Sequence, residues 1–187
     1  MRGLLLAAQL GFALGRVHPD GRDITHNHLG RGLVAAAHLR VPMVGSLVFD
    51  VEVAQWKVND DDPTSTFSLT TREIGGTLLL RTPTAPVTLA AGGGVRATYE
   101  TYRSTYFDPA GLGSDPFGPF QETSSRMLLS ADAALEIRLS RRLEVFAAVR
   151  TEVDVPFFDV ATSQRVQAGV RIALPTAPAN TGRGFRR

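Results

Sequence analysis

The sequence predicts an all-β fold, a closed antiparallel barrel of eight strands that run up and down in chain order. Three observations predict it: apolar and polar residues alternate with a period of two over about eight runs, helical periodicity is weak throughout, and long and short connections alternate between the runs. Eight antiparallel strands can close on themselves, which leaves no unpaired edge.

The expected strands cover residues 4–16, 31–41, 46–58, 67–81, 87–103, 125–139, 143–155 and 164–174. The first segment has a second interpretation, because residues 1–15 also resemble a signal peptide, in which Arg2 precedes an apolar core. Gln9 and Gly11 interrupt that core, and an even number of strands requires the segment, so we favour the strand. On this interpretation we expect the export signal to have been removed or to lie upstream of these residues.

The third to fifth strands separate two faces in different ways. In 46–58, Asp50 and Glu52 alternate with leucine, phenylalanine and valine. In 67–81, the apolar positions change phase, which a β-bulge around 71–73 would explain. In 87–103, the valine, leucine and alanine face opposes a face of glycine, threonine, arginine and glutamate.

The last three strands alternate most regularly. Leu129 lies on an aliphatic face of 125–139 that opposes arginine, aspartate and glutamate. In LEVFAAVRTEVDV, residues 143–155, Val145 and Val149 alternate with charged residues, and Val170 does so in 164–174. Each of these strands therefore has one apolar and one charged face.

The composition of the two faces indicates which one meets the interior. The charged face also carries small residues, and its opposite charges, which include those of Arg72 and Arg165, nearly balance, as a crowded and confined lumen requires. The apolar face is mostly leucine, valine and alanine, with few of the large aromatic residues that fill a ligand-binding calyx. We therefore predict a transmembrane β-barrel in which Val145, Val149, Leu129 and Val170 face lipid.

The connections predict how the barrel is oriented. Those after the first, third, fifth and seventh strands, 17–30, 59–66, 104–123 and 156–162, are longer than PMVGS, TPTAPV and SRR. Four longer extracellular loops and short periplasmic turns are typical of outer-membrane barrels. Aromatic residues near the long loops predict a girdle at that interface: Trp56, Phe67, Tyr99, Tyr102, Tyr106, Phe157 and Phe158.

The segments ALEIRLSRRLEVFAAVRTEVDV and RVQAGVRIAL, with the alternating connections, resemble the small eight-stranded outer-membrane β-barrel family of OmpA- and OmpX-like porin-fold proteins. The resemblance covers residues 4–174, although the last strand ends in Leu174 where the family usually has an aromatic residue. It implies a bacterial outer-membrane location, contact with lipid and lipopolysaccharide, and a monomer. We expect residues 1–174 to form the barrel domain and residues 175–187 a disordered polar tail.

Composition excludes several classes of protein and site. The chain has no cysteine, so disulfides and cysteine-based zinc sites or catalysis are excluded. A net charge of +2 does not favour nucleic-acid binding. No run approaches 18 uninterrupted apolar residues, which excludes a membrane-spanning helix. We expect no cofactor.

The candidate functional site is an ion-pair network that plugs the lumen. Pairing across the SRR turn sets Arg138 opposite Glu144 and Asp132 opposite Arg150, with opposite charges on the inward face. The predicted network comprises Asp132, Glu136, Arg138, Glu144, Arg150 and Glu152, together with Arg96 and Arg171. Such a lumen predicts a structural or surface-contact role, without catalysis.

Two other functions and two weaker sites compete with this interpretation. A soluble lipocalin-like barrel would bind an apolar ligand, and a lipid A-modifying enzyme would use a loop histidine with Ser65, Ser104 or a carboxylate. His26 and His28 are weak candidates for a metal site, for which a solvated loop is the simpler explanation. The NDDDP segment lacks the spacing of a calcium loop.

Overall fold

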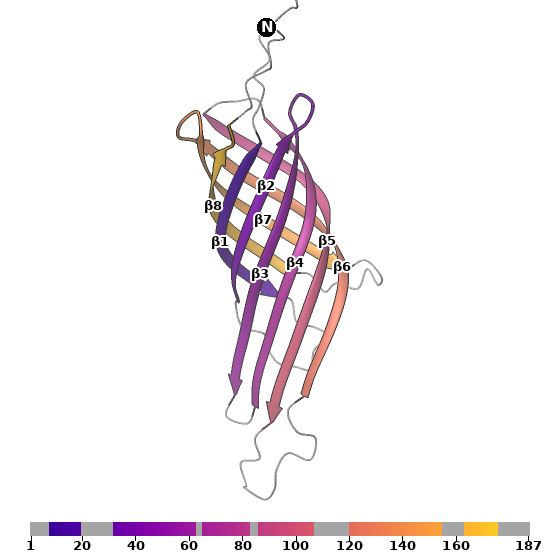
Figure 1. The fold of residues 1–187 in the computed structure, drawn as a ribbon. Coiled ribbons are helices and arrows are strands. Elements are labelled where there is room, and N and C mark those ends of the chain that lie inside the picture. Colours follow the sequence, from indigo (N-terminus) through magenta and orange to yellow (C-terminus); the bar gives the residue numbers. More distant parts are fainter. Residues whose placement is uncertain are drawn as a thin grey trace, which may run out of the picture.

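The computed structural model describes residues 8–19, 32–62, 65–82, 86–106, 120–154 and 163–175. Its strands form one closed antiparallel barrel (Figure 1). They are β1 (Gln9–Pro19), β2 (Gly32–Pro42), β3 (Leu47–Asp62), β4 (Ser65–Arg81), β5 (Val87–Tyr106), β6 (Phe120–Arg138), β7 (Leu143–Asp154) and β8 (Ser163–Ala173). Within the described residues, no helix is long and apolar enough to cross a membrane.

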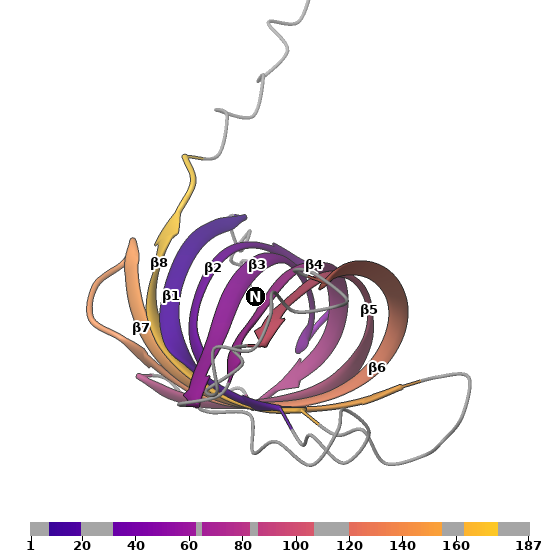
Figure 2. The ribbon, with the colours of Figure 1, turned by 90° about the horizontal axis from the view of Figure 1, so that it is seen from below.

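The barrel closes between its first and last strands. Each strand pairs with its neighbours in sequence, and β1 pairs with β8 from Gln9 opposite Ala173 to Pro19 opposite Ser163. Viewed along its length, the sheet forms a continuous ring (Figure 2). The predicted all-β barrel is confirmed, and Gln9–Pro19 is a strand. Residues 1–7 and the predicted tail from 176 to 187 lie outside the described residues.

The strands β3 to β6 extend further at the loop end than predicted. The segment 59–66, expected to be a loop, is mostly strand, because Asp62 pairs with Ser65 in a continuous ladder. Similarly, β5 continues to Tyr106 and β6 begins at Phe120. Figure 1 shows these four strands reaching beyond β1, β2, β7 and β8 at one end of the barrel.

The bulge predicted near 71–73 is wrong. Residues of β3 and β4 pair one to one along the whole ladder. Leu69 and Leu79 point into the barrel, whereas Ile74 and Leu78 point outward. The apparent change of phase arises because the inward face of β4 is apolar at Leu69, and not because the strand shifts.

The outer face of the barrel carries an apolar belt. Its residues include Leu129, Val149 and Val170, which are 43%, 52% and 41% exposed, as predicted for lipid-facing positions. Val145 shares their outward register and is half-buried. On β6 the belt runs from Met127 to Ile137. About ten residue steps of ~3.4 Å at a tilt of ~40° give roughly 26 Å, close to the hydrophobic height of such barrels.

The interior contains apolar residues as well as charges, which the sequence analysis did not predict. A cluster on the inner wall of β1 to β4, with Phe146 from β7, comprises Ala13, Val17, Val34, Ala36, Ala54, Trp56, Val58 and Leu69. Trp56 is 5% exposed, and its Nε1 donates to Glu73 Oε1 at 2.6 Å. Its predicted place in an interfacial girdle is therefore wrong. Tyr99 does face outward, and Tyr102 packs against the interior cluster.

Two glycines allow β4 and β5 to approach closely on the inner face. A Cβ atom at Gly92 would lie 1.9 Å from the carbonyl oxygen of Leu78, and one at Gly94 would lie 2.2 Å from that of Gly76. These contacts are with backbone atoms, which cannot rotate away. Glycine is therefore required where the two strands approach this closely.

Candidate functional site: the charged lumen

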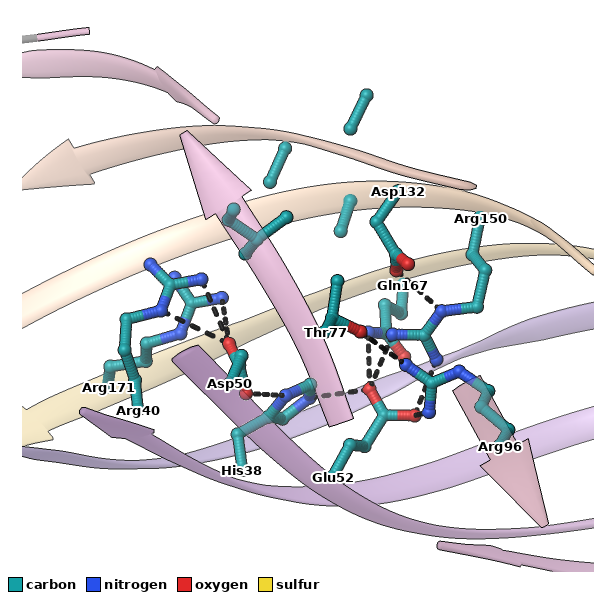
Figure 3. Close-up of a pocket in the computed structure, with 14 residues that line it drawn as sticks. His38, Arg40, Asp50, Glu52, Thr77, Arg96, Asp132, Arg150, Gln167 and Arg171 are labelled. Atoms are coloured by element: carbon teal, nitrogen blue, oxygen red, sulfur yellow. Dashed lines mark hydrogen bonds and ion pairs between the residues drawn. The ribbon is translucent and has the colours of Figure 1, made fainter. Parts of the chain in front are cut away.

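The middle of the lumen holds a buried network of arginines and carboxylates. Every carboxylate whose side chain the structure describes lies at an inward position of its strand, including those at the rim. The central charges form two groups, one toward the loop end and one toward the turn end, and residues from both line a small cavity (Figure 3).

Glu52 of β3 is the centre of the group toward the loop end. Its carboxylate accepts hydrogen bonds from Arg150 at 2.6 and 3.1 Å, Arg96 at 3.1 Å and Arg165 at 2.9 Å. The amide of Gln167 donates to it at 3.2 Å. These donors come from β5, β7 and β8, so one carboxylate connects opposite walls of the barrel.

The arginines around Glu52 are shared with further carboxylates. Arg150 Nε lies 2.5 Å from Asp132 Oδ1, and Arg165 also pairs with Glu73. Glu152 lies 3.5 Å from Arg96 and 3.6 Å from Arg165. Each positive charge thus has more than one negative neighbour, which offsets the cost of burying it.

The second group centres on Glu136 and Glu144. Glu136 pairs with Arg40, with Arg171 at 3.0 Å and with Arg81 at 2.6 Å. Glu144 is 3.0 Å from both Arg171 and Arg81. Strands β2, β4, β6, β7 and β8 all contribute, so this group also spans the lumen.

His38 lies between the two groups. Its Nδ1 is 3.3 Å from Asp50 Oδ1, and its Nε2 is 3.4 Å from Glu52 Oε2. Asp50 in turn accepts from Arg40 at 2.9 and 3.1 Å. The Phe146 ring contacts the edge of His38 and lies 3.6 Å below the Arg171 guanidinium, so it packs against both.

The cavity within the network has a volume of about 20 Å³ and is lined by residues such as His38, Arg96, Asp132 and Gln167. A buried water molecule needs a cavity in which its centre has on the order of 10–15 Å³ of free space. The cavity has room for about one water molecule and for no organic ligand. Among the described residues, the charged part of the lumen around this cavity does not have the form of a calyx for an apolar ligand, which argues against the lipocalin-like alternative.

The structure places most of the predicted network residues together. The predicted register across the SRR turn is confirmed, since Asp132 is opposite Arg150 and Arg138 opposite Glu144. Asp132, Glu136, Glu144, Arg150, Glu152, Arg96 and Arg171 all form ion pairs in the lumen. Arg138 is half-buried and forms none with the described residues, because Glu144 is engaged by Arg171 and Arg81.

Several members of the network were not among the predicted site residues: Glu52, Asp50, Arg165, His38, Arg40, Arg81 and Glu73. Glu52, Asp50 and Arg165 had been recognised only as parts of a polar face. Glu73 and Arg81 lie on β4, where the assumed bulge obscured the alternation, and Arg72, placed with the inward charges, is exposed on the outer face instead. A strict odd and even alternation along β4 would have identified all three.

The alternative sites lie largely outside the described residues. This holds for His26 and His28 and for the side chains of Ser65 and Ser104. His18 is exposed at the end of β1. Among the described side chains, no cluster of histidine, aspartate and glutamate has the arrangement of a metal site.

The architecture matches solved outer-membrane barrels at low sequence identity. No protein-family model and no curated protein sequence matches the chain. Neisserial surface protein A has a TM-score of 0.61 at 16% identity, covering 89% of this chain and 96% of that one. A major outer membrane protein of Thermus thermophilus has a TM-score of 0.57 at 12% identity, covering 90% and 100%. For Ail, the attachment invasion locus protein of Yersinia pestis, the values are 0.52, 14%, 90% and 97%.

Proposed function

We propose, from a fold shared with eight-stranded outer-membrane β-barrels, that this chain spans the bacterial outer membrane as a monomer. The observation that carries this proposal is the inversion of polarity, with charges inside the barrel and an apolar belt of roughly 26 Å outside. A soluble barrel would be expected to have the opposite arrangement. The closed sheet has no free edge to recruit a second chain, which supports a monomer.

Substitution of Val170 by arginine tests the membrane assignment. Val170 pairs with Phe12 and Val145 on the outer face, and it lies midway along the exposed apolar run of β8 from Val166 to Leu174. Val170→Arg should lower the free energy of unfolding in lipid vesicles by about 2–4 kcal/mol. Gln164→Arg is the matched control, since Gln164 is exposed on the same strand beyond the belt, and should cost about 0–1 kcal/mol. Equal losses in reversible urea unfolding would contradict the assignment.

We also propose that the ion-pair network plugs the lumen and that the protein has a structural or surface-contact role. The buried arginines and carboxylates engage one another across the barrel, and the cavity between them has room for about one water. Charged groups so engaged are poorly placed for catalysis, which supports a non-enzymatic role.

The long β3 to β6 extension at the loop end would present the contact surface. Ail, named as an attachment protein, has been solved with a heparin analogue.

A double-mutant cycle on Asp132 and Arg150 tests whether the lumen charges act as one network. Removing Arg150 alone leaves the half-buried carboxylate of Asp132 without an ion-pair partner among the described residues. The loss in the double alanine variant should therefore fall short of the sum of the single losses, with a coupling of about 0.5–3 kcal/mol. Strictly additive losses, measured by unfolding in lipid, would rule out the network.

A further inference from the structure

The charges that the structure describes on the outer face of the barrel are all of one sign. Among the side chains that the structure describes, no carboxylate lies at an outward strand position. Four permanently charged residues do, and all are basic: Arg16, Lys57, Arg72 and Arg103. The inward face holds the opposite charges in near balance, so the excess of positive charge is confined to the outside.

These residues lie at the loop-side edge of the apolar belt. Arg72 comes one outward position beyond Ile74, while Lys57 and Arg103 come two outward positions beyond Val53 and Tyr99. If the proposed function holds, this is the depth of the lipid head groups in the outer leaflet. Tyr99, which is 50% exposed, lies at the same edge, where tyrosine is favoured.

Three of the four residues are arranged on adjacent strands. Arg72 of β4 is opposite Gln55, so Lys57 of β3 is its diagonal neighbour at roughly 7–8 Å, within reach of long side chains. Arg72 is also opposite Tyr99 of β5, and Arg103 lies four residues further along that strand, roughly 14 Å from Tyr99. Lys57, Arg72 and Arg103 therefore lie on one outer face of β3, β4 and β5, with Arg103 nearest the loop end; we call these three residues the basic patch.

No residue of the basic patch forms an ion pair with a described residue. Arg103 Nε donates to the amide oxygen of Gln121 at 3.2 Å, a neutral acceptor that adds no negative charge. In contrast, Arg96, Arg150 and Arg165 inside the lumen each pair with Glu52 and with a further carboxylate. The patch is therefore complementary to an anion supplied by its surroundings.

We infer that the basic patch binds the phosphate groups of outer-leaflet lipid, an inference that rests on the proposed membrane location. Guanidinium groups bind phosphate through two parallel hydrogen bonds, and Lys57 adds a compact ammonium charge. A basic residue near an anionic membrane surface contributes an attraction equivalent to about a fivefold change in binding. The acyl chains of a lipid hold its phosphate group at the depth of the basic patch. A free anion in solution is not held at that depth.

Lys57 provides the readout, because it is the only lysine in the chain. The full chain is folded into phosphatidylcholine vesicles with and without lipid A, and acylation of Lys57 by an amine-reactive ester is followed by mass spectrometry. Lipid A should slow acylation by at least roughly fivefold. Arg72→Gln with Arg103→Gln should abolish most of that protection, whereas the turn pair Arg141→Gln with Arg142→Gln should retain it.

The outcomes separate this inference from the proposed function. Failure of the chain to insert into either vesicle as a β-sheet protein would overturn the proposed function itself. Insertion without protection of Lys57, or protection that survives in the Arg72 and Arg103 variant, would overturn the basic patch alone. Equal protection by inorganic phosphate in phosphatidylcholine vesicles would show a site for free anions and overturn the assignment to lipid.

Discussion

Replacing Glu52 by glutamine should destabilise the barrel by about 3–5 kcal/mol, because it leaves buried arginines without their shared carboxylate. Glu52 is 1% exposed and accepts hydrogen bonds from Arg96, Arg150 and Arg165. Glutamine keeps the volume and removes the charge, so the loss reports electrostatics and not a cavity. Reversible urea unfolding in lipid vesicles, followed by the fluorescence of the single tryptophan, Trp56, measures the change.

The control for this experiment is Glu122→Gln, which removes a carboxylate at an exposed position near the rim of β6. It should change the free energy of unfolding by no more than about 0.5 kcal/mol. A second comparison adds Arg150→Met to Glu52→Gln. This removes one of the positive charges left without a carboxylate partner and should recover part of the lost free energy of unfolding. A loss below about 1 kcal/mol for Glu52→Gln would mean that the network contributes little to the folded state.

Replacing Gly92 by alanine should cost about 3 kcal/mol or more, at the upper end of overpacking effects. The new Cβ atom would be placed 1.9 Å from the carbonyl oxygen of Leu78 and 2.9 Å from the Cα atom of Leu79. Relief requires β4 and β5 to separate, which weakens their ladder of hydrogen bonds. Unfolding of the variant in lipid vesicles measures this cost.

The adjacent Gly93 supplies the control. It points outward, and a Cβ atom there meets only the Ser130 carbonyl oxygen, at 3.1 Å. Gly93→Ala should therefore cost at most about 1 kcal/mol while changing the same strand and the same backbone entropy. If the two alanine variants are equally stable, the close approach of β4 and β5 does not require glycine at position 92.

Alternation along the chain was sufficient to predict the strands, because side chains of a strand point to opposite faces with a period of two. It failed on β4, where Leu69 is both apolar and inward, and on Trp56, which looks interfacial in sequence but lies inside. Both residues belong to the part of the barrel nearest the loop end. There the outer face becomes polar, as at Gln55 and Lys57, and apolar residues fill the inside, so the rule for the belt no longer applies.

The ion pairs within the site were predictable only where the two residues are neighbours across a turn. Asp132 and Arg150 face each other because the SRR turn fixes the register of β6 and β7. No comparable local rule connects Glu52 with Arg150 or Arg40 with Glu136, which meet across the lumen. Their contacts depend on the diameter and stagger of the closed barrel, which a single sequence does not specify directly.

The hydrogen bonds of Glu52 to distant strands also constrain how the chain can enter a bilayer. Its arginine partners lie 44, 98 and 113 residues further along the sequence, on β5, β7 and β8. A hairpin of β3 and β4 that crossed first would carry its carboxylates into hydrocarbon with no counter-ions, and non-local contacts of this kind form late in folding. We therefore expect concerted insertion, in which all the strands cross the bilayer together and the seam between β1 and β8 closes as the charges meet.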